Sequence, residues 1–143
     1  MSFRATLMSV VVASVLAPPP SQAAEPDRSA FDAFGGKAGL DRVADVGVER
    51  VIHDPRIQDR FKGANIPRLK MQLSTQFCAL LNGPCDYTGK DMQQAHAGMG
   101  LKDYDFNALA EDFQIAMDEV GVPYRWQNSL ISKLAPMERQ ISQ

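Results

Sequence analysis

The sequence has few of the residues on which binding and catalytic sites most often depend. It contains two histidines, two cysteines and one tryptophan in 143 residues. The cysteines form no Cys-x-x-Cys or Cys-x-x-Cys-His motif, which excludes a zinc ribbon, a thioredoxin-type site and covalent attachment of c-type haem. Two histidines with two distant cysteines are also a poor ligand set for zinc. The sequence contains no nucleophile elbow, so a hydrolytic triad is not indicated.

A long apolar segment is also absent. The run from Ala5 to Ala17 is uncharged and mostly apolar, but it is too short to span a bilayer. Arg4 precedes this run, three prolines follow it, and Ser21-Gln22-Ala23 then offers small residues for cleavage. This order predicts a secretory signal peptide over residues 1–24, which is cleaved, and a periplasmic or secreted protein. A flexible N-terminal tail with some apolar residues is the alternative.

The sequence also has no large excess of positive or negative charge. The whole chain has 15 Lys+Arg and 17 Asp+Glu, and removal of Arg4 with the signal peptide leaves 14 against 17, a net charge of −3. This argues against nucleic acid or an anionic membrane as the main partner. Residues 25–29 are then a linker, and residues 30–143 form one domain. A chain of this size can build one core, to which an embedded apolar cofactor would add buried area.

Export changes how the two cysteines are interpreted. In an oxidising compartment Cys78 and Cys85, seven residues apart, are able to form a disulfide. The alternative is two separate, partly buried thiols, which we favour because helix geometry aims the two side chains apart.

The pattern after the linker is helical, and no alternating strand pattern competes with it. Apolar residues at three- to four-residue spacing predict a short helix before Gly35-Gly36, helices over 37–53, 67–81, 91–96, 103–120 and 123–141, and a short segment over 56–62. Asp91 and Asp103 are the predicted N-caps of the helices that they open. The fold class is therefore all-α.

His96 lies in the stretch MQQAHAGMGL, between two alanines and before a Gly-x-Gly break. Small neighbours let something bulky approach this histidine. A haem needs only one strong protein ligand, and a neutral imidazole on a helix that packs against a flat ring fits the pattern. A surface or buried histidine without a ligand is the alternative. We expect that plain role for His53, which lies beside Asp54 at a helix end.

Residues from about 29 to 140 resemble the group I truncated haemoglobins, short globins that fold as a two-over-two helical sandwich. The motifs that carry the resemblance follow one another in the family's order and spacing: Gly35-Gly36, His53-Asp54-Pro55-Arg56, Phe61, Asn65 with Arg68-Leu69-Lys70, Leu81-Asn82-Gly83-Pro84, Tyr87-Thr88-Gly89, Met92 with Ala95-His96-Ala97-Gly98 and Gly100, Gly121-Val122-Pro123, and Leu134-Ala135-Pro136. Together they cover nearly the whole chain after the signal peptide.

The resemblance implies one non-covalent haem b, with His96 as the proximal iron ligand. The residues expected to contact the haem are the apolar Phe61, Leu69, Leu73, Phe77, Met92 and Met99, and the polar Arg68, Lys70 and Tyr87 near its propionates. The residues expected to serve as both core and pocket wall are Val48, Leu69, Leu73, Phe77, Phe106, Phe113 and Leu130.

The expected distal pocket departs from the family's pattern. Members often hold oxygen with a tyrosine on the second helix and a glutamine on the distal helix, but alignment puts Val48 and Leu73 at those two positions. Leu69 agrees with an apolar residue that the family tolerates at the distal position. A buried hydrogen bond is worth about 1–3 kcal/mol, so weak oxygen retention is expected. Gln72 and Gln76 are candidate substitute donors, although Gln72 suits a position near a propionate equally well.

The function that the resemblance implies is reversible binding of O2, CO or NO by a monomer or weak dimer, with an unknown reductase. A haem redox enzyme, such as a nitric oxide dioxygenase or a peroxidase-like enzyme, is an alternative that lacks polar groups to steer oxygen or peroxide. An electron-transfer protein would need a second axial ligand; His53 is badly placed for this, and Met71 or Met99 would require rearrangement. A helical module without a cofactor is the remaining alternative.

Overall fold

The computed structural model describes residues 26–142, so the predicted signal peptide lies outside the described residues. The elements are α1 (Ser29–Ala33), α2 (Gly36–Val51), η1 (Gln58–Phe61), α3 (Ile66–Leu80), α4 (Met92–His96), α5 (Asp103–Val120), α6 (Tyr124–Leu134), η2 (Ala135–Met137) and α7 (Glu138–Ile141). None of the residues from 26 to 142 forms a strand, and each helix among them is too short or too polar for a transmembrane span. The all-α prediction is confirmed.

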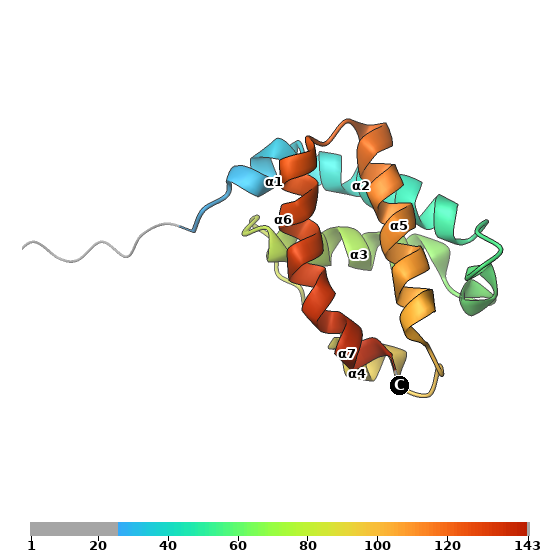
Figure 1. Cartoon of the computed structure of the whole chain (residues 1–143). Coiled ribbons are helices and arrows are strands. Elements are labelled where there is room, and N and C mark those ends of the chain that lie inside the picture. Colours follow the sequence, from blue (N-terminus) through green and yellow to red (C-terminus); the bar gives the residue numbers. More distant parts are fainter. Residues whose placement is uncertain (1–25, 143) are drawn as a thin grey trace, which may run out of the picture.

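The long helices form two layers that cross. Figure 1 shows α5 and α6 running across α2 and α3, with α4 and α7 together at one end of the molecule. Between the layers the rings of Phe77 and Phe113 meet edge to face, with centroids 5.5 Å apart. Gly47 makes this close approach possible, because a Cβ atom there would lie 2.4 Å from the Phe113 ring. The two-over-two arrangement is the one that the sequence predicts.

Local sequence explains where α3 and α4 begin. The side chain of Asn65 accepts a hydrogen bond from the Arg68 N–H at 3.0 Å, and Pro67 follows in the first turn, where its missing N–H costs nothing. Asp91 accepts from the Gln94 N–H at 2.7 Å, as predicted. Both helices therefore start where capping side chains satisfy backbone donors that have no partner within the helix.

Two predictions about helix ends are wrong in detail. Asp103 is the first residue of α5 and not its cap; the cap is Lys102, whose N–H donates to the carboxylate of Asp105 at 2.9 Å. The predicted single helix over 123–141 is three pieces, α6, η2 and α7. Pro136 explains the interruption, because it has no N–H to donate and its ring clashes with the preceding turn.

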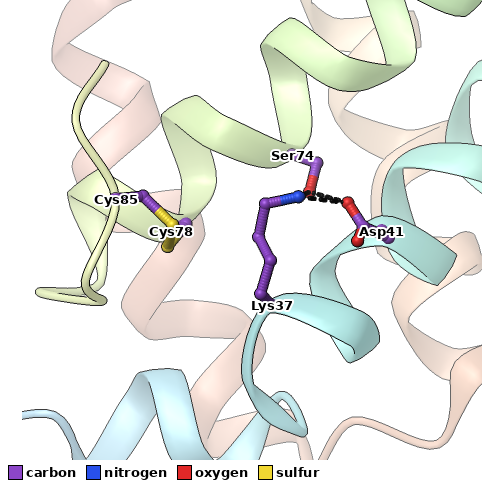
Figure 2. Close-up of a disulfide and its surroundings, with 5 residues drawn as sticks. All are labelled: Lys37, Asp41, Ser74, Cys78 and Cys85. Atoms are coloured by element: carbon purple, nitrogen blue, oxygen red, sulfur yellow. Dashed lines mark hydrogen bonds and ion pairs between the residues drawn. A yellow bond between two sulfur atoms is a disulfide. The ribbon is translucent and has the colours of Figure 1, made fainter.

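Cys78 and Cys85 form a disulfide, which corrects the preference for two separate thiols (Figure 2). Their Cα atoms are 5.8 Å apart, within the range that the bond allows. The chain reverses directly after α3 through Asn82, whose φ of 59° is left-handed, and the Gly83 N–H donates to the Cys78 carbonyl at 2.8 Å. This reversal brings Cys85 back onto the end of α3, which helix geometry alone does not predict.

Removal of the disulfide should weaken the fold measurably. The bond closes a loop of eight residues, and loop-closure entropy predicts that Cys78→Ser with Cys85→Ser lowers the free energy of unfolding by about 2.5 kcal/mol. Urea unfolding measures this loss. The unsubstituted protein in dithiothreitol is the control and should unfold together with the double variant. Equal urea midpoints for the variant and the oxidised protein would contradict the prediction.

A polar link through a buried hydroxyl also joins α2 to α3 (Figure 2). The hydroxyl of Ser74, which is fully buried on α3, accepts from Lys37 Nζ at 2.9 Å and donates to Asp41 Oδ1 at 2.5 Å. Lys37 also forms an ion pair with Asp41. The serine is inaccessible to a substrate, so this lysine–serine–aspartate group fixes the register of the two helices and is no catalytic site.

Candidate functional site

His96 is the last residue of α4 and is half-buried. Its Nδ1 atom lies 2.8 Å from the carbonyl oxygen of Met92, one turn earlier in the same helix. A carbonyl oxygen only accepts, so Nδ1 carries the proton, and in the neutral ring Nε2 then holds a lone pair. An imidazole oriented in this way is ready to bind a metal through Nε2.

The predicted apolar wall lies on one face of α3. Leu69, Leu73 and Phe77 follow one another at four-residue intervals, so their side chains share that face. Phe77 is buried, whereas Leu69, Leu73 and Phe61 of η1 are partly buried and pack against the core. Val48 of α2 is fully buried. The wall is therefore apolar, and the part that remains accessible is formed by Leu69, Leu73 and Phe61.

Lys70 forms ion pairs with α2, and its predicted contact with a haem propionate stays a prediction. Its Nζ atom lies 2.5 Å from Asp45 Oδ1 and 2.6 Å from Glu49 Oε1, both on α2. The hydrogen bond to Asp45, followed by that to Glu49, raises the pKa of Lys70. Lys70 and Met71 line a surface hollow of about 680 Å³ together with residues of α2 and α5. Met71 lies two residues from both Leu69 and Leu73 and thus on the opposite face of α3.

The loop before α4 contains Tyr87, which is partly buried. The Tyr87 hydroxyl donates to the Lys90 carbonyl at 3.0 Å, and burial raises the pKa of this phenol. A Cβ atom on Gly89 would lie 2.5 Å from the Tyr87 ring and 2.7 Å from Oε1 of Gln72. Gln72 therefore lies against this loop, at the rim of the predicted pocket. Arg68 is exposed in the first turn of α3.

Gln76 is almost fully buried, with 7% of its surface exposed. Its Nε2 atom is 3.6 Å from Sδ of Met92 and 3.8 Å from Sδ of Met137. Met92 belongs to the helix that ends in His96. The amide of Gln76 thus faces the helix that carries His96, and its role as a substitute donor to a bound gas stays a prediction.

Arg60, which no sequence pattern singles out, connects the segment before the predicted pocket to the loop that follows His96. Its guanidinium binds both carboxylate oxygens of the buried Asp105 on α5, at 3.0 and 3.2 Å. It also donates to the carbonyl of Met99, three residues after His96, at 3.4 Å. Arg60 thereby holds the turn that carries Phe61 against the loop that follows His96. Its partners lie 39 and 45 residues away, so no local motif reveals the contact.

A second set of charges fixes the end of α2 to α5. Arg56 forms ion pairs with Asp54 at 2.8 Å and with Glu111 of α5 at 2.6 Å. The hydrogen bond from Arg56 lowers the pKa of Asp54. The carboxyl of Asp112 is buried against Asp54, and its Oδ2 meets no donor in the part of the chain that the structure describes. Burial, and then the charge of Asp54, raise the pKa of Asp112.

The raised pKa of Asp112 predicts a dependence of stability on pH. The folded protein retains a proton that the unfolded chain releases near its ordinary pKa of 3.8, so this site weakens the fold as the pH rises through the raised pKa. Asp112→Asn keeps a donor toward Asp54 and cannot ionise. We expect the variant to have a higher melting temperature than the unsubstituted protein at pH 7, and the difference to shrink toward pH 4.

Melting temperatures measured from pH 4 to pH 8 test this, with Asp103→Asn as an exposed control at the start of the same helix. A difference between Asp112→Asn and the unsubstituted protein that stays constant over this range would contradict the assignment.

Comparison with known proteins identifies the family. Residues 29–143 match the model of the bacterial-like globin family. The chain is 34% identical over 119 residues to the group 1 truncated hemoglobin GlbN of Mycolicibacterium paratuberculosis, which covers 83% of this chain and 87% of that protein.

Solved structures agree in fold. Truncated hemoglobin from Tetrahymena pyriformis superposes with a TM-score of 0.76 at 25% identity, over 79% of this chain and 97% of that one. Variants of that protein, with one tyrosine or either of two glutamines replaced, superpose equally well. A 2/2 hemoglobin from a Synechococcus species, with covalently attached heme, gives a TM-score of 0.73 at 20% identity, over 79% of this chain and 97% of that one. The chain therefore belongs to the bacterial-like globin family and, within it, to the group 1 truncated haemoglobins.

Proposed function

We propose that this globin binds one haem b without a covalent bond, uses His96 as the proximal iron ligand, and reversibly binds O2, CO or NO. The observation that carries the proposal is the 2.8 Å contact between His96 Nδ1 and the Met92 carbonyl, which leaves Nε2 as the free ligand atom. The partly buried Phe61, Leu69 and Leu73 offer the apolar surface that a flat macrocycle needs. When bound, the haem iron would supply the coordination position for a diatomic gas.

The disulfide supports non-covalent attachment of the haem. The relative from Synechococcus has a covalently attached heme. In this chain the two cysteines are bonded to each other, so neither thiol is free to form a thioether. The contacts expected to retain the haem are therefore coordination by His96 and burial of apolar surface.

Weak retention of oxygen follows from the apolar residues on the expected distal side. In the variants of the Tetrahymena pyriformis protein, the replaced tyrosine precedes the two replaced glutamines by 21 and 25 positions. Val48 precedes Leu69 and Leu73 by the same intervals. This supports the alignment that replaces all three polar residues by apolar ones, none of which donates a hydrogen bond to a bound gas.

Gas binding is favoured over electron transfer, which would require a second axial ligand. His53 Nδ1 lies 2.7 Å from the Glu49 carbonyl at the exposed end of α2. Met71 is exposed beside Lys70, on the face of α3 opposite Leu69 and Leu73. Redox catalysis on O2 or peroxide is disfavoured by the apolar distal residues, because such chemistry needs polar groups near the reacting atoms.

We also propose that the protein is exported to the periplasm or secreted. The order of charged, apolar and small residues in the first 24 positions supports this. The disulfide between Cys78 and Cys85 agrees with it, because such bonds persist in oxidising compartments.

Titration of the purified protein with haemin, followed by absorption spectra of the oxidised, reduced and reduced CO-treated forms, tests the proposed function. We expect saturation at one haemin per chain and a Soret band that shifts when CO is added. Free haemin has a broad Soret band of its own, so a band that neither sharpens nor saturates at one haemin per chain would overturn the haem assignment. A Soret band that CO does not shift would overturn gas binding and favour electron transfer.

A further inference from the structure

We propose that Gln76 is a positioning residue for His96: its buried amide holds Met92, and the carbonyl of Met92 orients the imidazole. This inference rests on the proposed function, because it concerns the residue that would bind the haem iron. It gives a role to a glutamine whose amide faces the helix that ends in His96.

The side-chain amide of Gln76 is buried beside two thioethers. Gln76 is 93% buried, since 7% of its surface is exposed, and its two N–H donors face the thioethers of Met92 and Met137. Thioether sulfur is a weak acceptor, but a buried amide without any partner would cost about 1–3 kcal/mol. A leucine would fill a similar volume without that cost. We therefore assign the amide an orienting role: its N–H groups hold the sulfur atoms of Met92 and Met137 in place.

Helix α4 is too short to be stable on its own. This helix has five residues, none of them buried, and Gly98 and Gly100 follow it with left-handed backbones. An isolated helix of this length is not stable in water, so its position depends on its neighbours. Figure 1 shows α4 beside α7 at the end of the molecule, and Gln76 contacts Met92 of α4 as well as Met137, directly before α7. Gln76 thus joins α3 to both segments.

Met92 links Gln76 to His96, because it contacts both residues. Met92 is the residue whose carbonyl accepts from His96 Nδ1 at 2.8 Å. A movement of Met92 changes this bond, and the bond selects the tautomer and the orientation of a ligating imidazole. The path from Gln76 to the ligand atom therefore contains two contacts, one from amide to thioether and one from carbonyl to imidazole.

The chain provides its own control for a test. Its other histidine, His53, has the same kind of bond, from Nδ1 to the carbonyl of Glu49 four residues earlier, at 2.7 Å. Glu49 and His53 lie at the end of α2 and have no contact with the Gln76 amide among the described residues. Both imidazoles give separate signals in nitrogen-15 NMR spectra, which report which ring nitrogen carries the proton.

The experiment compares the haem-free protein with Gln76→Leu at pH 8.5, where imidazole side chains are generally uncharged. We expect the ratio of the Nδ1–H to the Nε2–H tautomer of His96 to fall about three- to tenfold, as loss of one hydrogen bond predicts, while His53 is unchanged. Met92→Leu keeps the carbonyl and most of the volume but lacks the sulfur acceptor, and should give the same fall. Adding Gln76→Leu to Met92→Leu should then cause no further change.

A second readout uses the haemin-loaded ferrous protein. Gln76→Leu should shift the iron–histidine stretching band in the resonance Raman spectrum, whereas Met71→Leu, on the exposed and opposite face of α3, should not. An unchanged His96 tautomer in Gln76→Leu, or equal changes at His96 and His53, would overturn the inference and leave Gln76 a purely structural role. Because the NMR readout needs no haem, this failure is distinguishable from a failure of the proposed function, which would show as the absence of saturable haemin binding.

Discussion

His96→Ala is expected to weaken haemin binding by at least about 100-fold and to abolish the normal spectrum of the ferrous protein. Loss of a group that only supports a metal ligand typically costs 10–100-fold in affinity, and removal of the ligand itself should cost no less. The remaining apolar surface of Phe61, Leu69 and Leu73 would still attract haemin, so some weak binding should persist. The measurement is the rate and extent of haemin transfer to an excess of a competing apoglobin.

His53→Ala is the matched control, because His53 has the same backbone contact at the end of a helix but no predicted role in haem binding. Its spectrum and haemin retention should equal those of the unsubstituted protein. Added imidazole should restore a histidine-like ferrous spectrum to His96→Ala by occupying the position of the deleted ring. Retention of the same haemin affinity and ferrous CO spectrum by His96→Ala would show that another residue binds the iron.

The helices were predictable because their information is local. The apolar residues of α2, from Leu40 to Val51, recur at helical spacing and are buried as expected. Capping by Asp91 was also predictable, because it depends only on adjacent residues. The family motifs extended this local information to the arrangement of the helices and to His96, whose hydrogen bond to Met92 agrees with the ligand role that we propose.

The polar contacts were less predictable because they depend on which helix faces which. Lys70 forms ion pairs with Asp45 and Glu49 of α2, 25 and 21 residues earlier in the chain, and no local pattern predicts them. The contact of Arg60 with Asp105 likewise needs the packing of η1 against α5. Periodicity identifies the apolar face of a helix, but it does not identify the partner of a charge on its flank.

The Cys78–Cys85 disulfide was misjudged for a related reason. The expectation treated α3 as a straight helix and did not include the left-handed turn at Asn82. Three residues after that turn, Cys85 lies beside the end of the helix. Positive φ at a residue other than glycine is uncommon, so neither the turn nor the pairing was a safe prediction from the sequence.

Leu73→Gln is expected to slow oxygen dissociation about tenfold or more, while CO dissociation changes much less. Dioxygen in a haem pocket is more polarised than CO and gains more from a hydrogen-bond donor, and each 1.4 kcal/mol is a factor of ten. Leu73 is the suitable position because it is only partly buried and belongs to the apolar face of α3. Val48 is fully buried, so a tyrosine there would overpack the core and confound the measurement.

Leu73→Met is the control, since it has a similar volume and offers no N–H group. Stopped-flow mixing of the oxygenated protein with CO gives the oxygen dissociation rate, and replacement of CO by NO gives the CO rate. A slow oxygen rate in Leu73→Gln alone would show that residue 73 faces the bound gas and that a missing donor limits oxygen retention. Equal oxygen rates in the two variants would show that the apolar face of α3 is not the distal wall, so the alignment that pairs Leu73 with the family's glutamine would have to be abandoned even if His96 binds the iron.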